Sequence, residues 1–371
     1  MDPTRDRPLT VAIVAPSLDI LGGQAIQADR LLRAWRDDPE VRAWLVPINP
    51  PPPGPLRGAA RVKYLRTVAT QLAYWPLLVR ELRKADVVHV FSASYWSFLL
   101  APLPAAIVGR LFGKPVVVNY HSGEAPDHLR RSAIARATLR RVDRNVVPSR
   151  FLHDVFAGFG IPSDVVANTI DLERFPFRAR EGLRPRLLST RSFEPLYNVA
   201  CTLRAFRLVQ QRHPEADLTL VGSGSQQAKL QRLADELGLK RVTFVGRVPP
   251  DQIWRYYADA DVYVQTPDID NMPLSVLEAF ASGCPVVSTG AGGVPAMLTD
   301  GVHGLLAPRD DHHAIAAAVL RLLDDPALVR SVTEAARRAC ADVEWPAVRG
   351  HWLRLYRRLA APAGVAAPTP A

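Results

Sequence analysis

The chain has 371 residues, of which 48% are hydrophobic and 22% charged, and its formal net charge is +10. This length suits two globular domains better than one and is not that of a tail or a fibre. Residues 1–175 carry 23 Lys and Arg against 16 Asp and Glu, so the first half holds most of the positive charge. This positive charge produces an electrostatic field that would attract nucleic acid, anionic lipid or a phosphorylated substrate alike.

No targeting or membrane-spanning segment is expected. The apolar run at 95–109 is shorter than the ~20 residues that a spanning helix needs, and it contains prolines. The N-terminus lacks the apolar core of a secretory signal. Cys201, Cys284 and Cys340 are odd in number and far apart, which argues against disulfides and a zinc site and favours buried thiols. We expect a cytoplasmic protein, with peripheral contact at the inner face of the membrane left open.

Apolar runs alternate with amphipathic segments in both halves, a pattern typical of parallel sheets covered on both faces. In the first half, a glycine turn LGGQ and a helix at 25–35 follow the first strand. Other helices are expected at 226–238 and 351–360. The predicted strands occupy residues 10–18, 85–92, 115–121 and 144–149, then 186–192, 216–224, 241–248, 260–267, 284–290 and 304–308.

A proline-rich segment without helical period separates the halves, which places the domain boundary near residue 175. We predict an N-terminal and a C-terminal α/β domain. A C-terminal helix should return to the first domain, followed by a disordered tail. The N-terminal domain comprises residues 1–175 and the C-terminal domain residues 176–345. The returning helix is 346–360 and the tail 361–371.

The stretch PDIDNMPLSVLEAFASGCPVVS, residues 267–288, combines a strand end, a helix start and a buried carboxylate. Its helix is expected from Pro273 to Ser282, and Glu278 lies among apolar residues, where an unpaired charge would cost several kcal/mol. A phosphate at the helix start and ribose hydroxyls at Glu278 would together describe a nucleoside diphosphate. A structural ion pair with a nearby arginine is about equally compatible with this pattern.

These motifs resemble the retaining glycosyltransferases of family four, group 1, over nearly the whole chain. The signature is two acids eight positions apart followed by a helix and a strand, and Asp270 and Glu278 hold those positions. The resemblance implies the GT-B architecture, an α/β fold of two Rossmann-like, doubly wound domains that face a cleft. It also implies that the N-terminal domain lies on the acceptor side and that the C-terminal domain binds the nucleotide sugar. In the second domain, Glu278 would bind the nucleotide ribose and Asp270 would contact the donor sugar.

Further site residues follow from the same resemblance. His121 matches a histidine near the reacting centre, and Arg191 in STRSFEPLYNV matches an arginine that clamps the diphosphate. The implied catalytic residues are His121, Asp270 and Arg191. The implied donor-binding residues are Gly22, Gly23, Arg191, Asp270, Asn271, Met272, Leu274, Ser275 and Glu278.

Three positions depart from the family pattern. Asp270 replaces the usual glutamate and is one methylene shorter, Pro273 replaces a glycine of the loop, and Tyr197 stands about where a second diphosphate-binding cation, a lysine, is usual. Arg247 could substitute for that lysine. An altered donor or an inactive site therefore stays open.

No cofactor or metal is expected, the nucleotide sugar being a substrate. GSGS at 222–225 lacks the third glycine of a G-x-G-x-x-G dinucleotide site and the Lys-Ser/Thr pair of a P-loop. GAGGVP at 290–295 either forms a plain turn or lets its backbone approach the donor closely. DID at 268–270 spells a metal-binding pattern of another glycosyltransferase fold, but Arg191 and the helix start can stabilise a leaving diphosphate instead.

We therefore predict a metal-independent, retaining transfer of a sugar from a nucleotide-diphosphate sugar to an acceptor hydroxyl. The alternatives are a nucleotide-sugar epimerase and a catalytically degenerate binding protein. The acceptor is undetermined, and no nucleic-acid motif is present. Basic amphipathic segments at 61–84, around a break at Pro76, and at 128–141 fit an anionic membrane or ordinary solvated faces equally well.

Overall fold

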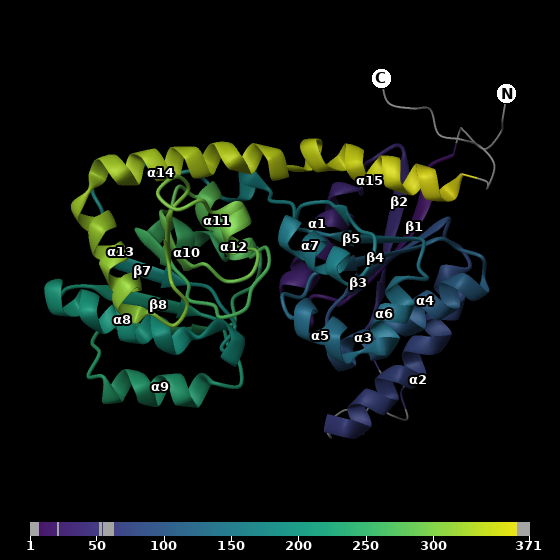
Figure 1. Ribbon diagram of the computed structural model, residues 1–371, viewed down its shortest axis with the longest axis horizontal. Helices are drawn as coiled ribbons and strands as arrows, with labels where there is room; N and C mark the ends of the chain where they lie inside the picture. Colours follow the sequence, from purple (N-terminus) through teal and green to yellow (C-terminus); the bar gives the residue numbers. More distant parts are fainter. Residues whose placement is uncertain (1–6, 21, 52–53, 55–62, 362–371) are drawn as a thin grey trace. The chain divides into compact units, whose positions relative to one another are not determined.

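The computed structural model describes residues 7–20, 22–51, 54 and 63–361 (Figure 1). The chain divides into two compact units. Unit 1 contains the residues up to Thr169 and those from Trp345 onward, and unit 2 is Ile170–Glu344. The domain boundary at residue 175 stays a prediction, and the predicted disordered tail lies outside the described residues except for Ala361.

Unit 1 is built on a six-stranded parallel sheet in the order β2-β1-β3-β4-β5-β6. The four strands predicted in this half are present, whereas β2 and β6 were not predicted. The strands are β1 Leu9–Ala15, β2 Val41–Pro47, β3 Val87–Ser92, β4 Val116–Tyr120, β5 Arg144–Val147 and β6 Asp164–Val165. The helices are α1 Gly23–Ala34, α2 Lys63–Leu82, α3 Tyr95–Leu100, α4 Pro102–Leu111, α5 Ala125–Arg131, α6 Ala133–Leu139, α7 Arg150–Gly158 and α15 Trp345–Ala360.

Helices cover both faces of this sheet, because successive strand residues point to opposite sides. Val88 and Val90 face the core formed with α2, α4 and α7. Val87 and Phe91 face the opposite core, formed with α1 and α15. The last helix, α15, begins at Trp345, six residues before the predicted start, and buries Trp352 against this second core.

The predicted break at Pro76 is wrong, since α2 is one helix from Lys63 to Leu82 with Pro76 inside it. A proline removes one backbone hydrogen bond and crowds the preceding turn. Tertiary packing offsets that cost here. Tyr74, Leu78 and Leu82 on either side of the proline are fully buried in the core.

Unit 2 repeats the architecture with a six-stranded parallel sheet in the order β12-β11-β10-β7-β8-β9. All six strands predicted in this half are present. The strands are β7 Arg186–Ser189, β8 Asp217–Val221, β9 Val242–Gly246, β10 Val262–Val264, β11 Val286–Thr289 and β12 Leu305–Ala307. The helices are α8 Val199–Arg212, α9 Gln227–Glu236, α10 Trp254–Asp259, α11 Leu274–Ala281, α12 Val294–Met297, α13 His312–Asp324 and α14 Pro326–Ala339.

The strand order of each sheet reverses once, which is the mark of a doubly wound fold. In unit 2 the reversal lies between β7 and β10, and in unit 1 it lies between β1 and β3. Ligands of such sheets bind at the carboxyl ends of the strands beside the reversal. Residues that follow β7 and β10, or β1 and β3, are therefore the first candidates for a site.

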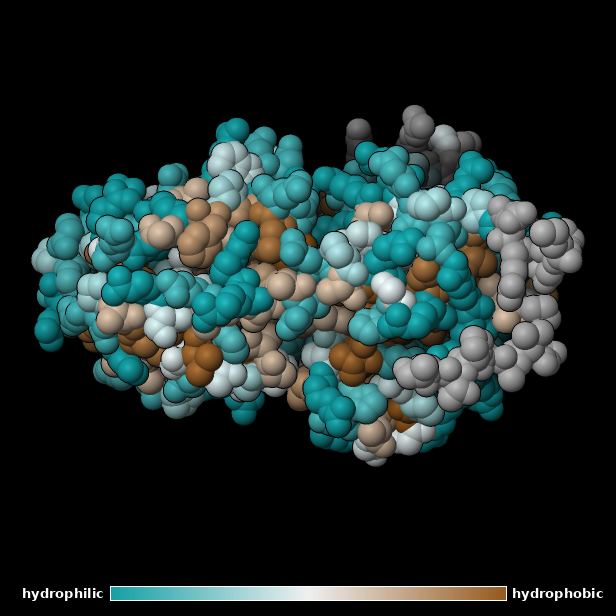
Figure 2. Space-filling view, turned by 90° about the horizontal axis from the view of Figure 1, so that it is seen from above, coloured by the Kyte–Doolittle hydropathy of each residue, from teal (hydrophilic) through white to brown (hydrophobic). Residues whose placement is uncertain are grey.

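Hydrophilic residues dominate the face in Figure 2, with hydrophobic ones scattered among them. None of the helices within the described part of the chain is long and apolar enough to cross a membrane. The three cysteines are buried and free, as the sequence predicts.

A buried histidine links β3 to the C-terminal helix. His89 Nδ1 lies 2.7 Å from Tyr356 Oη on α15, and His89 Nε2 lies 3.1 Å from Asn119 Nδ2 on β4. Burial lowers the pKa of His89 to about 3, with a smaller effect from His121. Both ring nitrogens have a partner, so the ring is held neutral inside the sheet.

We expect this histidine to make the protein sensitive to acid. Its pKa is depressed in the folded chain, so protons bind more tightly to the unfolded chain and stability falls as the pH drops below about 6.5, by roughly 1.4 kcal/mol per pH unit. Urea unfolding between pH 7.5 and pH 5 should therefore depend less steeply on pH in His89→Gln than in the natural protein. Equal slopes in both proteins would contradict this expectation.

Candidate active site

Arg191 lies two residues beyond β7, at the carboxyl edge of the second sheet. Its Nη2 donates to Asp270 Oδ2 at 2.7 Å, and its Nη1 donates to Ser275 Oγ at 3.1 Å. The guanidinium also lies over the ring of Tyr197, 4.0 Å from the centroid. Arg191 is only 8% exposed, so this cation is fixed in a largely buried position.

The charge of Arg191 is maintained by its neighbours. Burial by itself lowers the pKa of the guanidinium, but the Asp270 carboxylate and nearby tyrosines outweigh burial and raise it. The predicted site thus contains a preformed, buried ion pair. Such a pair is costly to break by removing one partner, because the other charge is left uncompensated.

Asp270 belongs to a short loop between β10 and α11. Its Oδ1 accepts from the backbone N–H of Asn271 at 2.9 Å, while its Oδ2 pairs with Arg191. Asp268, the other acid of the DID sequence, accepts from Asn198 at 3.3 Å. The two carboxylates are therefore oriented by different partners.

Helix α11 carries the second acid of the motif. It runs from Leu274 to Ala281, and Pro273 precedes it instead of forming its first residue, with an extended ψ of 122°. The predicted stop is confirmed, since Gly283 has φ +66° and the N–H of Cys284 donates to Ala279 O at 2.8 Å. This is a Schellman end, for which glycine is the favoured residue.

Glu278 lies on this helix and is 6% exposed. Tyr257 Oη on α10 donates to Glu278 Oε2 at 3.1 Å. Burial, and then the charge of Glu278, raises the pKa of Tyr257 well above its usual range, so the phenol keeps its proton. Thr190 Oγ1 lies 2.6 Å from the same phenol oxygen. The carboxylate is thus held by a neutral hydrogen-bond donor.

The structure brings the C-terminal candidates together in unit 2. Ser275 links them, because its hydroxyl accepts from Arg191 and lies 3.3 Å from Gln265 Oε1. Asn271 is 3% exposed and Leu274 is 8% exposed, in the same segment. Met272 lies between them in the sequence. Tyr257, Thr190 and Gln265 were missed by sequence reasoning, since hydroxyls and amides inside ordinary elements carry no motif.

Two glycine segments have structural roles. A Cβ at Gly222 would lie 2.1 Å from Arg191 O, and a Cβ at Gly224 would lie 2.5 Å from Phe193 O. The GSGS turn therefore packs against the backbone that carries Arg191. Gly293 in GAGGVP approaches the acid loop equally closely, because a Cβ there would lie 2.5 Å from Asn271 O.

Gly293→Ala should disturb the site through this contact. The added methyl would push the Asn271 backbone and shift Asp270, so we expect a loss of about 1–3 kcal/mol in stability and weaker donor binding. Gly290→Ala is the matched control, since its Cβ would meet Pro295 Cγ at an ordinary 3.8 Å. Thermal unfolding with and without nucleotide checks both variants, and equal behaviour of the two would refute the role of Gly293.

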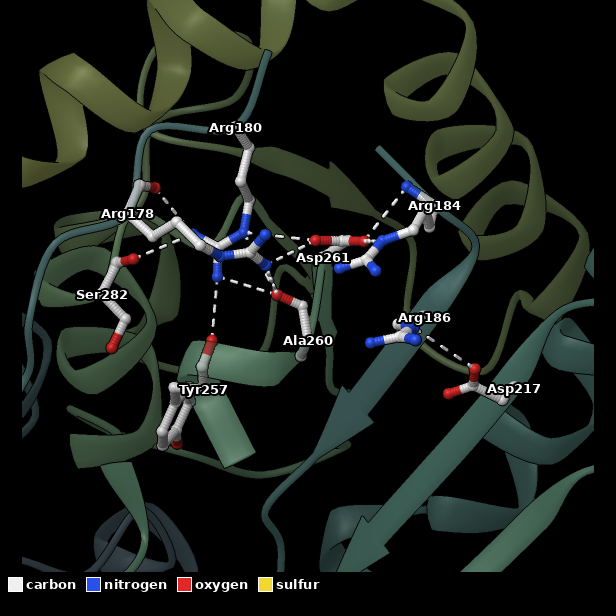
Figure 3. A network of polar contacts seen from close by, with 9 residues as sticks. All are labelled: Arg178, Arg180, Arg184, Arg186, Asp217, Tyr257, Ala260, Asp261 and Ser282. Atoms are coloured by element: carbon white, nitrogen blue, oxygen red, sulfur yellow. Dashed lines mark hydrogen bonds and ion pairs between the residues drawn. The ribbon is translucent and has the colours of Figure 1, made fainter. Parts of the chain in front are cut away.

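Figure 3 shows the buried Arg180, whose hydrogen bonds join the backbone segments in and beside α10 and α11. Arg180 donates to Tyr257 O at 2.8 Å, to Ala260 O at 2.8 Å from Nη2, and to Ser282 O at 2.8 Å. These carbonyls lie in or beside α10 and α11, which carry Tyr257 and Glu278. Asp261, at the start of β10, pairs with Arg178 and Arg184 beside it. Nothing in the arginine-rich linker sequence indicated this contact.

The remaining candidates lie in unit 1. Gly22 and Gly23 follow β1 and begin α1, and among the described residues a Cβ at either would meet nothing within 4 Å. His121 follows β4, where its ring stacks on Phe91 with centroids 5.0 Å apart. Burial lowers the pKa of His121 to about 3, so its ring is neutral at physiological pH.

The structure shows the positions of Tyr197, one departure from the family pattern, and of Arg247, the suggested substitute for the missing lysine. Tyr197 supplies a π face beneath Arg191 in place of a second cation, and this contact stabilises the guanidinium. Arg247 follows β9 and donates from Nε to Ser223 Oγ at 2.7 Å. It lies at the same edge of the sheet as Arg191, so the carboxyl edge carries two arginines.

Comparisons with known proteins agree on the family. The model for "Glycosyl transferases group 1" matches residues 173–339, and the model for "Glycosyltransferase Family 4" matches residues 21–174. Glycogen synthase of Mycobacterium tuberculosis is 31% identical over 307 residues, which cover 77% of this chain and 72% of that protein. A GDP-mannose-dependent α-(1-6)-phosphatidylinositol monomannoside mannosyltransferase of Mycolicibacterium smegmatis is 29% identical over 289 residues, 70% and 74% of the two chains.

Solved structures agree on the fold. Sucrose-phosphate synthase of Thermosynechococcus elongatus superposes with a TM-score of 0.75 at 21% identity, over 95% of this chain and 99% of that chain. Anabaena HepE, solved with UDP-glucose, has a TM-score of 0.72 at 17% identity, over 94% and 100%. The family models and the two curated relatives give no support to the epimerase alternative. The chain therefore belongs to the glycosyltransferases of family four, group 1, and is a transferase with the GT-B fold.

Proposed function

We propose that the protein transfers a sugar from a nucleotide-diphosphate sugar to an acceptor hydroxyl, with retention of the anomeric configuration and without a metal ion. The observation that carries this proposal is the cluster of Arg191, Asp270, Ser275 and Glu278 beside the strand reversal of the second sheet. It combines a cation for a diphosphate with a buried carboxylate for paired hydroxyls. The name of the mannosyltransferase includes GDP-mannose and the HepE structure was solved in complex with UDP-glucose, which supports the donor class.

Each residue then has a defined task. Glu278 accepts hydrogen bonds from the ribose hydroxyls, and Arg191 binds the diphosphate and stabilises the charge of the leaving group. Asp270 contacts the donor sugar once the diphosphate competes for Arg191. Asn271, Met272, Leu274 and Ser275 line the donor, while Gly22, Gly23 and His121 belong to the acceptor-side unit.

Two arginines support the proposed independence of metal. A retaining transfer leaves a nucleoside diphosphate with concentrated negative charge, which either a divalent cation or fixed guanidinium groups can stabilise. Arg191 is already in place and charged, and Arg247 lies at the same sheet edge. Catalysis would then rest on positioning and on this fixed charge.

The test is a transfer assay that follows donor selection by thermal shift. UDP, GDP and ADP are screened first, since a ligand at 100 times its Kd adds about 2.7 kcal/mol of stability. The matching nucleotide sugars are then incubated with candidate acceptors, and the anomeric proton of the product is examined by NMR. A product with the donor's configuration, formed equally well in EDTA, supports the proposal. Inversion, or a full loss of activity in EDTA, would overturn the corresponding part.

A further inference from the structure

Helix α2 has a second apolar face that points away from the core of unit 1. Its inward side chains are buried, whereas four others recur at i, i+3, i+7 and i+10 and remain exposed, as expected for a stripe along one side of a helix. Leu72 in this stripe is 60% exposed, and Tyr64 beside it is 79% exposed. The members of this surface, the α2 stripe, are Leu65, Val68, Leu72 and Trp75.

The first turns of α2 extend beyond the neighbouring helices of unit 1, so the stripe is accessible to a large flat partner (Figure 1). Gln71 donates to Leu100 O and Tyr74 to Ala101 O, which attaches the middle of α2 to the start of α4. Residues 64–68, which precede this attachment, are all exposed, whereas Ala69 is buried. An apolar stripe on a projecting helix is unusual for a surface that meets only water.

Positive charge flanks the stripe. Between Lys63 and Lys84 the sequence has five Lys or Arg and one acid. Arg66 follows Leu65 directly and so lies about 100° around the helix from that member of the stripe. Arg80 near the end of α2 and Lys84 just beyond it both pair with Glu81. Trp75 and Tyr64 add aromatic rings, whose apolar bodies and polar tips suit a membrane–water boundary.

We propose that the α2 stripe docks the protein onto an anionic lipid bilayer, with the apolar side chains in the headgroup boundary and the basic side chains on the anionic headgroups. The exposed apolar stripe and the surplus of positive charge complement each other, because apolar insertion supplies affinity and the cations select anionic lipid. A second copy of this chain fits less well, since it would bring the same positive charges together. This inference is independent of the donor site, which lies in the other unit.

The experiment is co-sedimentation of the full chain with vesicles of phosphatidylcholine alone or mixed equally with phosphatidylglycerol. The protein should bind the mixed vesicles and not the neutral ones. Leu72→Glu should weaken binding by about tenfold, since a carboxylate would enter the boundary, and Arg66→Gln by about fivefold. Val302→Glu is the matched control, an exposed aliphatic residue of unit 2 given the same charge.

Nucleotide-induced thermal shifts on the same samples report folding and donor binding separately from lipid binding. Anionic-lipid binding that is lost in Leu72→Glu and kept in Val302→Glu supports the proposal. No binding by the folded natural protein would overturn it, as would binding that Leu72→Glu leaves intact. A dimer that Leu72→Glu converts to a monomer, without lipid binding, would identify the stripe as an interface between copies and also overturn it.

Discussion

Glu278→Gln is expected to weaken binding of the nucleoside diphosphate by at least about tenfold, and Glu278→Ala by about 100-fold or more. A carboxylate that accepts from two ribose hydroxyls makes charge-assisted bonds, each worth roughly 1.5–3 kcal/mol. The amide keeps an acceptor for Tyr257 but loses the charge. Stability should therefore change little in Glu278→Gln, because the 3.1 Å contact with the Tyr257 phenol can persist.

The control for this prediction is Tyr257→Phe, which removes the phenol and leaves the carboxylate. If Glu278 serves only as a structural partner of Tyr257, Glu278→Ala and Tyr257→Phe should lose similar stability and neither should affect nucleotide affinity. If Glu278 binds ribose, affinity falls mainly in the Glu278 variants. Isothermal titration with the diphosphate identified by thermal shift distinguishes these outcomes, and unchanged affinity in Glu278→Gln would refute the ribose role.

The fold was largely predictable because fully buried parallel strands occur in the sequence as short apolar runs. VVHVFS and VVVNY are buried at every position, as β3 and β4. The two missed strands lack this signal. β2 contains Arg42 and is only partly buried, and β6 is two residues long and exposed. Tertiary packing on both sides of Pro76 likewise overrides a local signal that reads as a break.

The site was predictable where a charged residue lies in an otherwise apolar stretch of sequence. Glu278 in an apolar helix is informative because a buried carboxylate requires partners. The identity of those partners depends on side chains brought together by the fold. Tyr257 lies 21 residues away in the sequence, and Arg180 reaches Ser282 over a separation of 102 residues. The ion pair of Arg191 with Asp270 was also missed, because each residue was considered as a ligand contact separately.

Arg191→Met should abolish most activity and also destabilise the protein. The substitution leaves Asp270 as a buried carboxylate whose side chain is 12% exposed, without its cation. Removing one partner of a buried pair typically costs about 3–5 kcal/mol, and losing a fixed cation at the leaving group typically lowers kcat by about 100- to 1,000-fold. Urea unfolding measures the first effect, and initial rates at saturating donor measure the second.

The double variant Arg191→Met with Asp270→Asn separates these two effects. Neutralising both partners removes the uncompensated charge, so most of the lost stability should return, while the diphosphate still lacks its cation. Activity should therefore remain low in a well-folded protein. Recovery of activity along with stability would mean that Arg191 acts only by holding Asp270. Arg191→Lys adds a further test, because a lysine keeps the charge but cannot contact Asp270 and Ser275 with a planar fork, so an intermediate rate is expected.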